Sequence, residues 1–152
     1  MATEVSLNVQ KMKELMEDPQ VRSWRAVLNS YKTMMRTLEE SMQDFEGCSL
    51  SRFQILLNLY FNGSMRPVEI AEKLQVTRGN ITMFLKRMVQ DELIEKEFSS
   101  GKVRPRFRLT DKGVSCFEEI FPCHIAKVKE TFPQLDDPSV AKLNRFVESS
   151  RS

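Results

Sequence analysis

Residues 67–88 read PVEIAEKLQVTRGNITMFLKRM and contain the start and stop signals of two helices. Pro67 suits the first turn of a helix, where the missing backbone donor leaves no hydrogen bond unmade. That helix has an apolar face formed by Ile70, Ala71 and Leu74, and its pattern stops at Gln75-Val76. Thr77 is then a capping residue for a second helix, with an apolar stripe formed by Ile81, Phe84, Leu85 and Met88. The stretch predicts two short helices joined by a tight turn.

A strand-like alternation of apolar and polar residues follows directly after this helix pair, beginning at Leu93-Ile94. We expect a hairpin with an outgoing strand from Ile94 to Phe98, a turn at Ser99-Ser100-Gly101 and a return through Arg104 to Leu109. Two short helices followed at once by a hairpin are typical of a winged helix-turn-helix. The expected fold class is therefore mainly α with a small β-hairpin wing.

The flanks of this central part predict further helices. Residues about 18 to 46 have apolar residues at helical spacing, which gives a helix of about 40 Å. Ser51 to Phe61 is apolar on most sides and predicts a buried helix. A helix from Thr110-Asp111 should be kinked at Pro122, and a terminal helix should be capped by Asp137. The first helix is too long for its own domain to cover, so a partner subunit is expected.

Composition and charge exclude several classes of protein. Residues 66–110 hold ten Lys and Arg against six Asp and Glu, and the rest holds thirteen against fifteen, so polyanion contact must be local. No window approaches the ~18 apolar residues of a membrane span, and we expect a soluble cytoplasmic protein. One histidine and three scattered cysteines (Cys48, Cys116 and Cys123) predict no metal site, and no motif suggests a cofactor or an enzyme.

The first turn of the helix at Thr77 is the strongest functional signal. It reads Arg78-Gly79-Asn80 and contains no acid, although the positive end of the helix dipole favours one. Arg78, Asn80 and Thr82 offer donors and acceptors of the type that read base edges, and Gly79 removes a side chain where close approach is needed. Lys86 and Arg87 are phosphate contacts or solvated charges. The alternative is an ordinary surface helix.

A row of basic residues on the hairpin is the second signal. Lys102, Arg104, Arg106 and Arg108 lie on its tip and return strand, with Lys96 on the outgoing strand. The arginines alternate, so they share one face while Phe107 and Leu109 point inward. Such a face suits the negative potential of a minor groove. The alternative is a set of charges that protects an exposed edge strand from aggregation.

These segments resemble the MarR family of bacterial and archaeal regulators. The similarity lies in Ile70 to Thr82, in Leu93-Ile94 and in Leu109-Thr110-Asp111-Lys112-Gly113. It implies a single domain over 1–152, with a DNA-binding part at about 48–110 and dimerisation helices at about 5–46 and 111–150. It also implies a homodimeric repressor that binds palindromic double-stranded DNA and is released by a small-molecule effector. The recognition helix would be 77–90 in the major groove, and the wing 95–108 at the minor groove.

The implied DNA contacts are Thr77, Arg78, Gly79, Asn80, Thr82, Met83, Lys86, Arg87, Lys102, Arg104, Arg106 and Arg108. Many family members have a basic residue where this chain has Met83, and an Asp-x-Arg where it has Gly101-Lys102-Val103 followed by Arg104. We expect Cys116 and Cys123 to be buried apolar residues, not oxidation sensors. The alternative function is a winged-helix module for protein assembly or for non-specific nucleic-acid binding.

Overall fold

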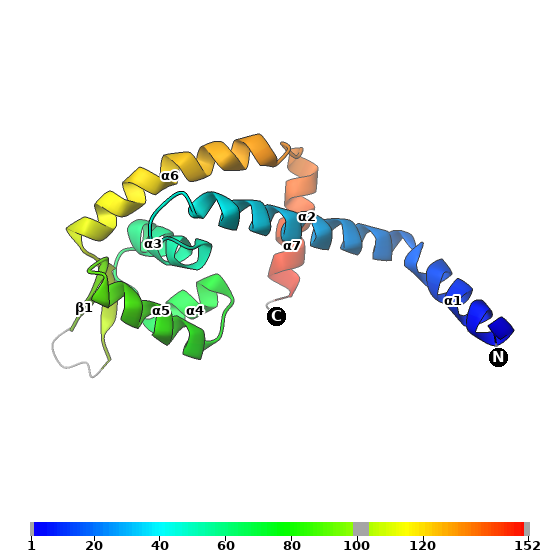
Figure 1. Cartoon of the computed structure of the whole chain (residues 1–152), viewed down its shortest axis with the longest axis horizontal. Helices are drawn as coiled ribbons and strands as arrows, with labels where there is room; N and C mark the ends of the chain where they lie inside the picture. Colours follow the sequence, from blue (N-terminus) through cyan, green and yellow to red (C-terminus); the bar gives the residue numbers. More distant parts are fainter. Residues whose placement is uncertain (1, 99–103, 151–152) are drawn as a thin grey trace. The chain divides into compact units, whose positions relative to one another are not determined.

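The computed structural model describes residues 2–98 and 104–150, and its contacts divide the chain into two compact units, Met1–Leu50 and Ser51–Ser152. From residue 19 onwards the elements follow the order that the sequence predicts, and a separate helix over residues 2–16 precedes them (Figure 1). They are α1 (Ala2–Met16), α2 (Pro19–Met42), α3 (Leu50–Asn62), α4 (Pro67–Leu74), α5 (Arg78–Gln90), β1 (Ile94–Glu97), β2 (Arg106–Leu109), α6 (Asp111–Thr131) and α7 (Asp137–Ser149). The mainly α fold with a small hairpin is confirmed. None of the described helices has the length and apolar character needed to cross a membrane.

The first unit consists of α1 and α2. The two helices are separated at Asp18, which caps α2. Its carboxylate accepts hydrogen bonds from the Gln20 and Val21 amides at 2.8 and 3.2 Å. Helix α2 ends at Met42, four residues before the predicted end at 46. Apolar spacing continues to Phe45, but the Phe45 amide donates to the Met42 carbonyl, three residues back, and the chain turns. The spacing of apolar residues therefore predicted too long a helix.

The core of the second unit lies between α3 and α6. Phe53, Ile55, Leu56 and Leu59 of α3 are buried, as are Phe117 and Ile120 of α6. The rings of Phe53 and Phe117 stack with centroids 5.8 Å apart. Burying one such side chain contributes about 1.5–3 kcal/mol. The shorter helices α4 and α5 also contribute buried side chains, among them Ile70 and Ile81.

Local signals position the helix pair α4 and α5 as the sequence predicts. Glu69 accepts a hydrogen bond from the Arg66 amide at 2.7 Å at the start of α4. Gln75, with φ of 55°, ends α4 in the left-handed conformation. Thr77 caps α5, because its hydroxyl oxygen accepts from the Asn80 amide at 3.4 Å. Figure 1 shows the two helices lying together.

The hairpin is shorter than predicted. Strands β1 and β2 are antiparallel, with Ile94 opposite Leu109 and Lys96 opposite Phe107. The return strand begins at Arg106, not at Arg104, because Pro105 has no N–H to donate to the ladder. The outgoing strand ends at Glu97, one residue before the predicted Phe98. The predicted turn at 99–101 lies outside the described residues.

A third segment pairs with the hairpin, which sequence reasoning did not foresee. The Met65 amide donates to the Phe107 carbonyl at 2.9 Å, and the Phe107 amide donates to the Met65 carbonyl at 2.8 Å. Met65 and Phe107 are both buried. The pairing therefore joins the residues just before α4 to the return strand of the wing.

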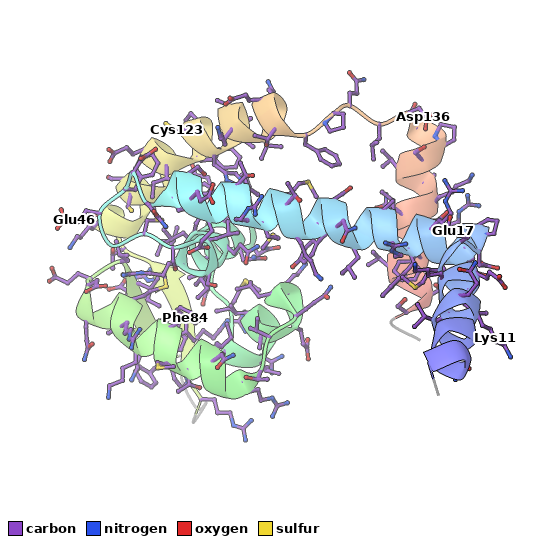
Figure 2. All side chains as sticks on the ribbon, turned by 45° about the vertical axis from the view of Figure 1, so that its right-hand side comes forward. Lys11, Glu17, Glu46, Phe84, Cys123 and Asp136 are labelled. Carbon is purple, nitrogen blue, oxygen red and sulfur yellow. The ribbon has the colours of Figure 1, made fainter. Side chains whose placement is uncertain are left out.

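The capping residue of the last helix differs from the expectation. Helix α6 runs from its cap Thr110 through Pro122 to Thr131. Helix α7 is capped by Asp136, whose carboxylate accepts from the Ser139 amide at 2.8 Å, at the start of the helix (Figure 2). The predicted cap, Asp137, is instead the first residue of the helix. Either aspartate could cap in sequence, and the extended backbone of Asp136 decides between them.

Candidate nucleic-acid interface

Helix α5 has one buried stripe and one exposed face. Ile81, Leu85 and Met88 are fully buried, which fixes the rotation of the helix about its axis. At 3.6 residues per turn, the positions opposite this stripe are 79, 83, 86, 87 and 90. These positions carry Gly79, Met83, Lys86, Arg87 and Gln90, and all five are exposed. We call this set the outward face of α5.

The polar side chains of α5 differ in what they can still bind. Arg78, Lys86 and Arg87 have no ion pair and no side-chain hydrogen bond within residues 2–98 and 104–150. The Thr82 hydroxyl donates to the Arg78 carbonyl at 2.9 Å, so only its oxygen lone pairs are left for a ligand. Thr77 uses its oxygen to cap the helix and can still donate. The three cations are therefore available to an outside anion.

Gly79 has no packing reason to be a glycine. A Cβ atom built on it would meet no atom within 4 Å. Glycine in a helix costs up to about 1 kcal/mol relative to alanine, because its backbone loses more freedom on folding. Nothing in the described structure offsets that cost. Without a side chain at this position, the surface of α5 leaves room for another molecule to approach the backbone closely.

The wing arginines do not form one equivalent row. Arg108 is paired with Glu95, with Nε and a terminal nitrogen 2.7 and 2.6 Å from the carboxylate. Arg106 donates from Nε to Ser64 Oγ at 3.3 Å and lies 3.4 Å from the Glu69 carboxylate. Arg104 is exposed and has no ion pair among the described residues. Lys102 lies outside the described residues.

Glu69 joins the wing to the start of α4. Its carboxylate accepts from the Arg66 amide and guanidinium and pairs with Arg106. The hydrogen bonds from Arg66 lower the pKa of Glu69, and the charges of Arg66 and Arg106 add to that effect. We call Ser64, Arg66, Glu69 and Arg106 the wing clasp. Sequence reasoning missed it, because only the Arg66 to Glu69 capping spacing is visible locally.

A second junction holds the far end of α5 against the start of α6. Arg52 of α3 pairs with Asp91, the residue that caps the end of α5. Lys112 donates to the Asp91 carbonyl at 2.8 Å, and Glu92 has a φ of 61°. Gly113 packs directly under the carbonyl of Leu93. The wing is thus anchored at both of its ends.

The cysteines only partly match the prediction of burial. Cys123 is exposed on α6 (Figure 2), and Cys116 and Cys48 are half-buried. The prediction for Cys123 is wrong, because the apolar side of α6 is formed by Phe117 and Ile120 and not by position 123. Burial, with a smaller effect of Glu119, raises the pKa of the Cys116 thiol. The ring of His124 packs against that of Phe53 in a tilted arrangement, with the centroids 4.4 Å apart, and burial lowers the pKa of the His124 ring.

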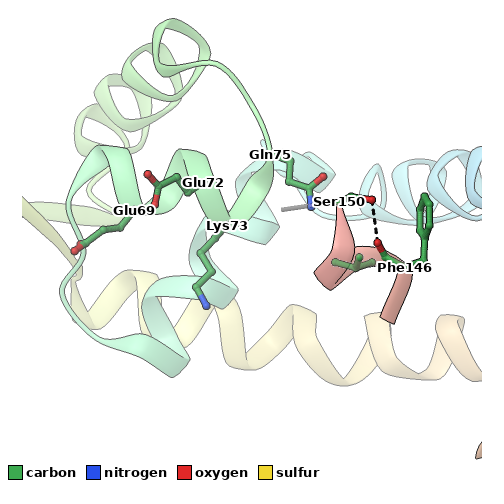
Figure 3. Close-up of a pocket in the computed structure, with 7 residues that line it drawn as sticks. Glu69, Glu72, Lys73, Gln75, Phe146 and Ser150 are labelled. Atoms are coloured by element: carbon green, nitrogen blue, oxygen red, sulfur yellow. Dashed lines mark hydrogen bonds between the residues drawn. The ribbon is translucent and has the colours of Figure 1, made fainter. Parts of the chain in front are cut away.

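A cavity of about 820 Å³ lies between α4 and α7 (Figure 3). It is lined by Glu69, Glu72, Lys73, Gln75, Phe146, Val147 and Ser150. Four of the seven, Glu69, Glu72, Lys73 and Gln75, come from α4 and its end, and the other three come from α7 and its end. One of its walls is Glu69 of the wing clasp.

The chain is similar to several characterised regulators. The family model described as MarR family matches residues 48–101. The HTH-type transcriptional regulator MhqR of Bacillus subtilis is 30% identical over 95 residues, which cover 62% of this chain and 66%, about two thirds, of that relative. AbsC, a MarR family transcriptional regulator from Streptomyces coelicolor, superposes with a TM-score of 0.77 at 23% identity, covering 88% of this chain and 93% of AbsC.

Sco3205, another MarR family transcriptional regulator from Streptomyces coelicolor, was solved in complex with DNA. It superposes with a TM-score of 0.74 at 20% identity, covering 85% of this chain and 83% of Sco3205. The helix pair, the hairpin and the outward face of α5 define a winged helix-turn-helix protein. The chain belongs to the MarR family of transcriptional regulators.

Proposed function

We propose that this chain is a cytoplasmic, homodimeric repressor that binds specific palindromic DNA and is released by a small molecule. The observation that carries the proposal is the outward face of α5, with cations that have no partner among the described residues and a glycine that faces open space. Helix α5 would lie in the major groove and the wing at the minor groove. The proposed contacts are Thr77, Arg78, Gly79, Asn80, Thr82, Met83, Lys86, Arg87, Lys102, Arg104, Arg106 and Arg108.

Exposed apolar faces support the proposed homodimer. On α7, Val140, Leu143, Phe146 and Val147 are exposed, with Phe146 at 66%. On α2, Trp24, Val27 and Tyr31 are exposed, with Trp24 at 60%. Several large apolar side chains exposed on one helix are typical of association surfaces in soluble proteins. A second copy of the chain would cover these faces. Each copy would form a single domain over residues 1–152, with the DNA-binding part at 48–110.

The cavity between α4 and α7 supports release by a small molecule. Its volume of about 820 Å³ is within the usual range for a small-molecule site. A ligand there would contact Glu69, the carboxylate that also holds Arg106 at the root of the wing. Binding and the position of the wing would be coupled if the ligand drew Glu69 away from Arg106.

Selection of duplexes from a random pool, followed by footprinting, tests the proposal. We expect the full-length protein to protect one bounded site with two-fold symmetry, and sedimentation to show a dimer at micromolar concentration. Sequence-indifferent coverage would favour the non-specific nucleic-acid module instead. A stable folded monomer would contradict the proposed architecture.

The wing arginines should affect the salt dependence of binding unequally. Arg104→Ala should reduce the slope of log affinity against log salt by about one per subunit, since one phosphate contact is lost from each. Arg106→Ala should change the slope less and lower the melting temperature more, because Arg106 is held by Ser64 and Glu69. Titrations at several salt concentrations, with thermal melts of both variants, make the comparison. Equal slope changes and equal melting temperatures would contradict the assignment of Arg106 to the wing clasp.

A further inference from the structure

Met83 lies at the centre of the outward face of α5. It is two residues from the fully buried Ile81, which places it about 200° around the helix from that side chain. Half of its side chain, 50%, is exposed. Gly79 precedes it by one turn, and Lys86 and Arg87 follow it by one turn on the same side. The apolar side chain is thus surrounded by a glycine and two cations.

A single exposed apolar residue is common on protein surfaces and by itself requires no explanation. The setting of Met83 is different, because its neighbours on this face point to a ligand independently. Gly79 faces open space at a cost in helix stability, and the cations next to Met83 lack partners within the described residues. These features prepare α5 for close contact with a polyanion. Met83 would then lie at the point of closest approach.

The floor of the major groove exposes few apolar groups, and the most prominent is the C5-methyl group of thymine. A methionine side chain is long, unbranched and polarisable, so it can adapt to a methyl group at the bottom of a groove. Because nothing lies within 4 Å of a Cβ at Gly79, the helix backbone would be able to approach closely enough for a side chain one turn further on to reach the base edges. Lys86 and Arg87 would meet the phosphates on either side.

We infer that Met83 is a specificity-determining residue that reads a thymine by packing on its C5-methyl group. The inference rests on the proposed function, and it names the base that one position of the proposed site would select. It replaces the hydrogen-bonding readout that a basic residue would provide at this point of the helix. The preference would be for a T·A pair at one position in each half-site.

Replacement of thymine by deoxyuridine tests the inference, because deoxyuridine lacks only the methyl group and keeps the base pairing. The probe is a duplex selected from the random pool by the full-length protein, with its thymines replaced one at a time. We expect one thymine in each half-site at which the replacement weakens wild-type binding about fourfold, as expected for the loss of one buried methyl group. Met83→Ala should bind the thymine and deoxyuridine duplexes equally at that position.

Two further variants serve as controls. Met83→Leu keeps an apolar side chain and should retain the sensitivity to deoxyuridine. Lys86→Ala should weaken binding to both duplexes by the same factor, because a phosphate contact does not depend on the base. If no thymine is sensitive, or if Met83→Ala keeps the sensitivity, the inference is wrong although specific binding still supports the proposed function. If no duplex is selected at all, both fail.

Discussion

Gly113→Ala is expected to destabilise the protein by roughly 3 kcal/mol or more, since it creates a severe overlap inside a packed junction. A Cβ atom on Gly113 would lie 2.0 Å from the Leu93 carbonyl oxygen and 3.0 Å from its carbonyl carbon. The atoms that it meets belong to the backbone and cannot move aside as the end of a flexible side chain can. The start of α6 would have to separate from the strand that begins the wing.

Urea unfolding followed by circular dichroism measures the effect, and thermal melting should show a decrease of about 10 °C for a chain of this size. Gly79→Ala is the matched control, because it is also a glycine in a helix but faces open space. It should leave the free energy of unfolding unchanged or raise it by up to about 1 kcal/mol. If Gly113→Ala proves as stable as the wild type, the described packing of α6 under Leu93 is wrong.

Gly79→Leu should separate folding from DNA binding. We expect its free energy of unfolding to be at least that of the wild type, because a Cβ atom at this exposed position meets no atom within 4 Å and leucine favours the helix. Binding to the selected duplex should weaken at least about a hundredfold, ~2.7 kcal/mol, since the side chain would hold the helix away from the groove. Fluorescence titration and urea unfolding of the same sample give both quantities.

Two further variants show whether the loss of binding depends on the size and the position of the added side chain. Gly79→Ala should weaken binding less than Gly79→Leu, because the methyl group is smaller than the leucine side chain. Ser115→Leu places the same residue on an exposed position of α6 and should leave DNA affinity unchanged. Full affinity in Gly79→Leu would mean that the outward face of α5 does not enter the groove, and the proposed site would have to be abandoned.

The order and type of the elements could be predicted from the sequence because their signals are local. Pro67, Gln75 and Thr77 start, end and restart helices through interactions with residues no more than four positions away. The spacing of Ile81, Leu85 and Met88 predicted which side of α5 is buried. The absence of an acid in the first turn of that helix marked the same element as the candidate site.

Contacts between residues that are distant in sequence could not be predicted and depend on the tertiary structure. Alternation placed Arg104, Arg106 and Arg108 on one basic row, but Ser64 and Glu69 hold Arg106, and Glu95 holds Arg108. The partners of Arg106 are about 40 residues away, and no local pattern indicates them. The same is true of Met65 beside Phe107. A charge in sequence does not reveal whether its partner lies inside the protein or outside it.

Local patterns in the sequence were therefore enough to predict most of the helices, the hairpin and the polar face of α5, although not every end or cap. The fold alone decided which of the basic side chains are left for a ligand and why Gly113 is required under Leu93. The physical reason is the range of the interactions. Capping and amphipathic spacing act within one or two helical turns, whereas ion pairs and steric contacts depend on which segments the folded core brings together.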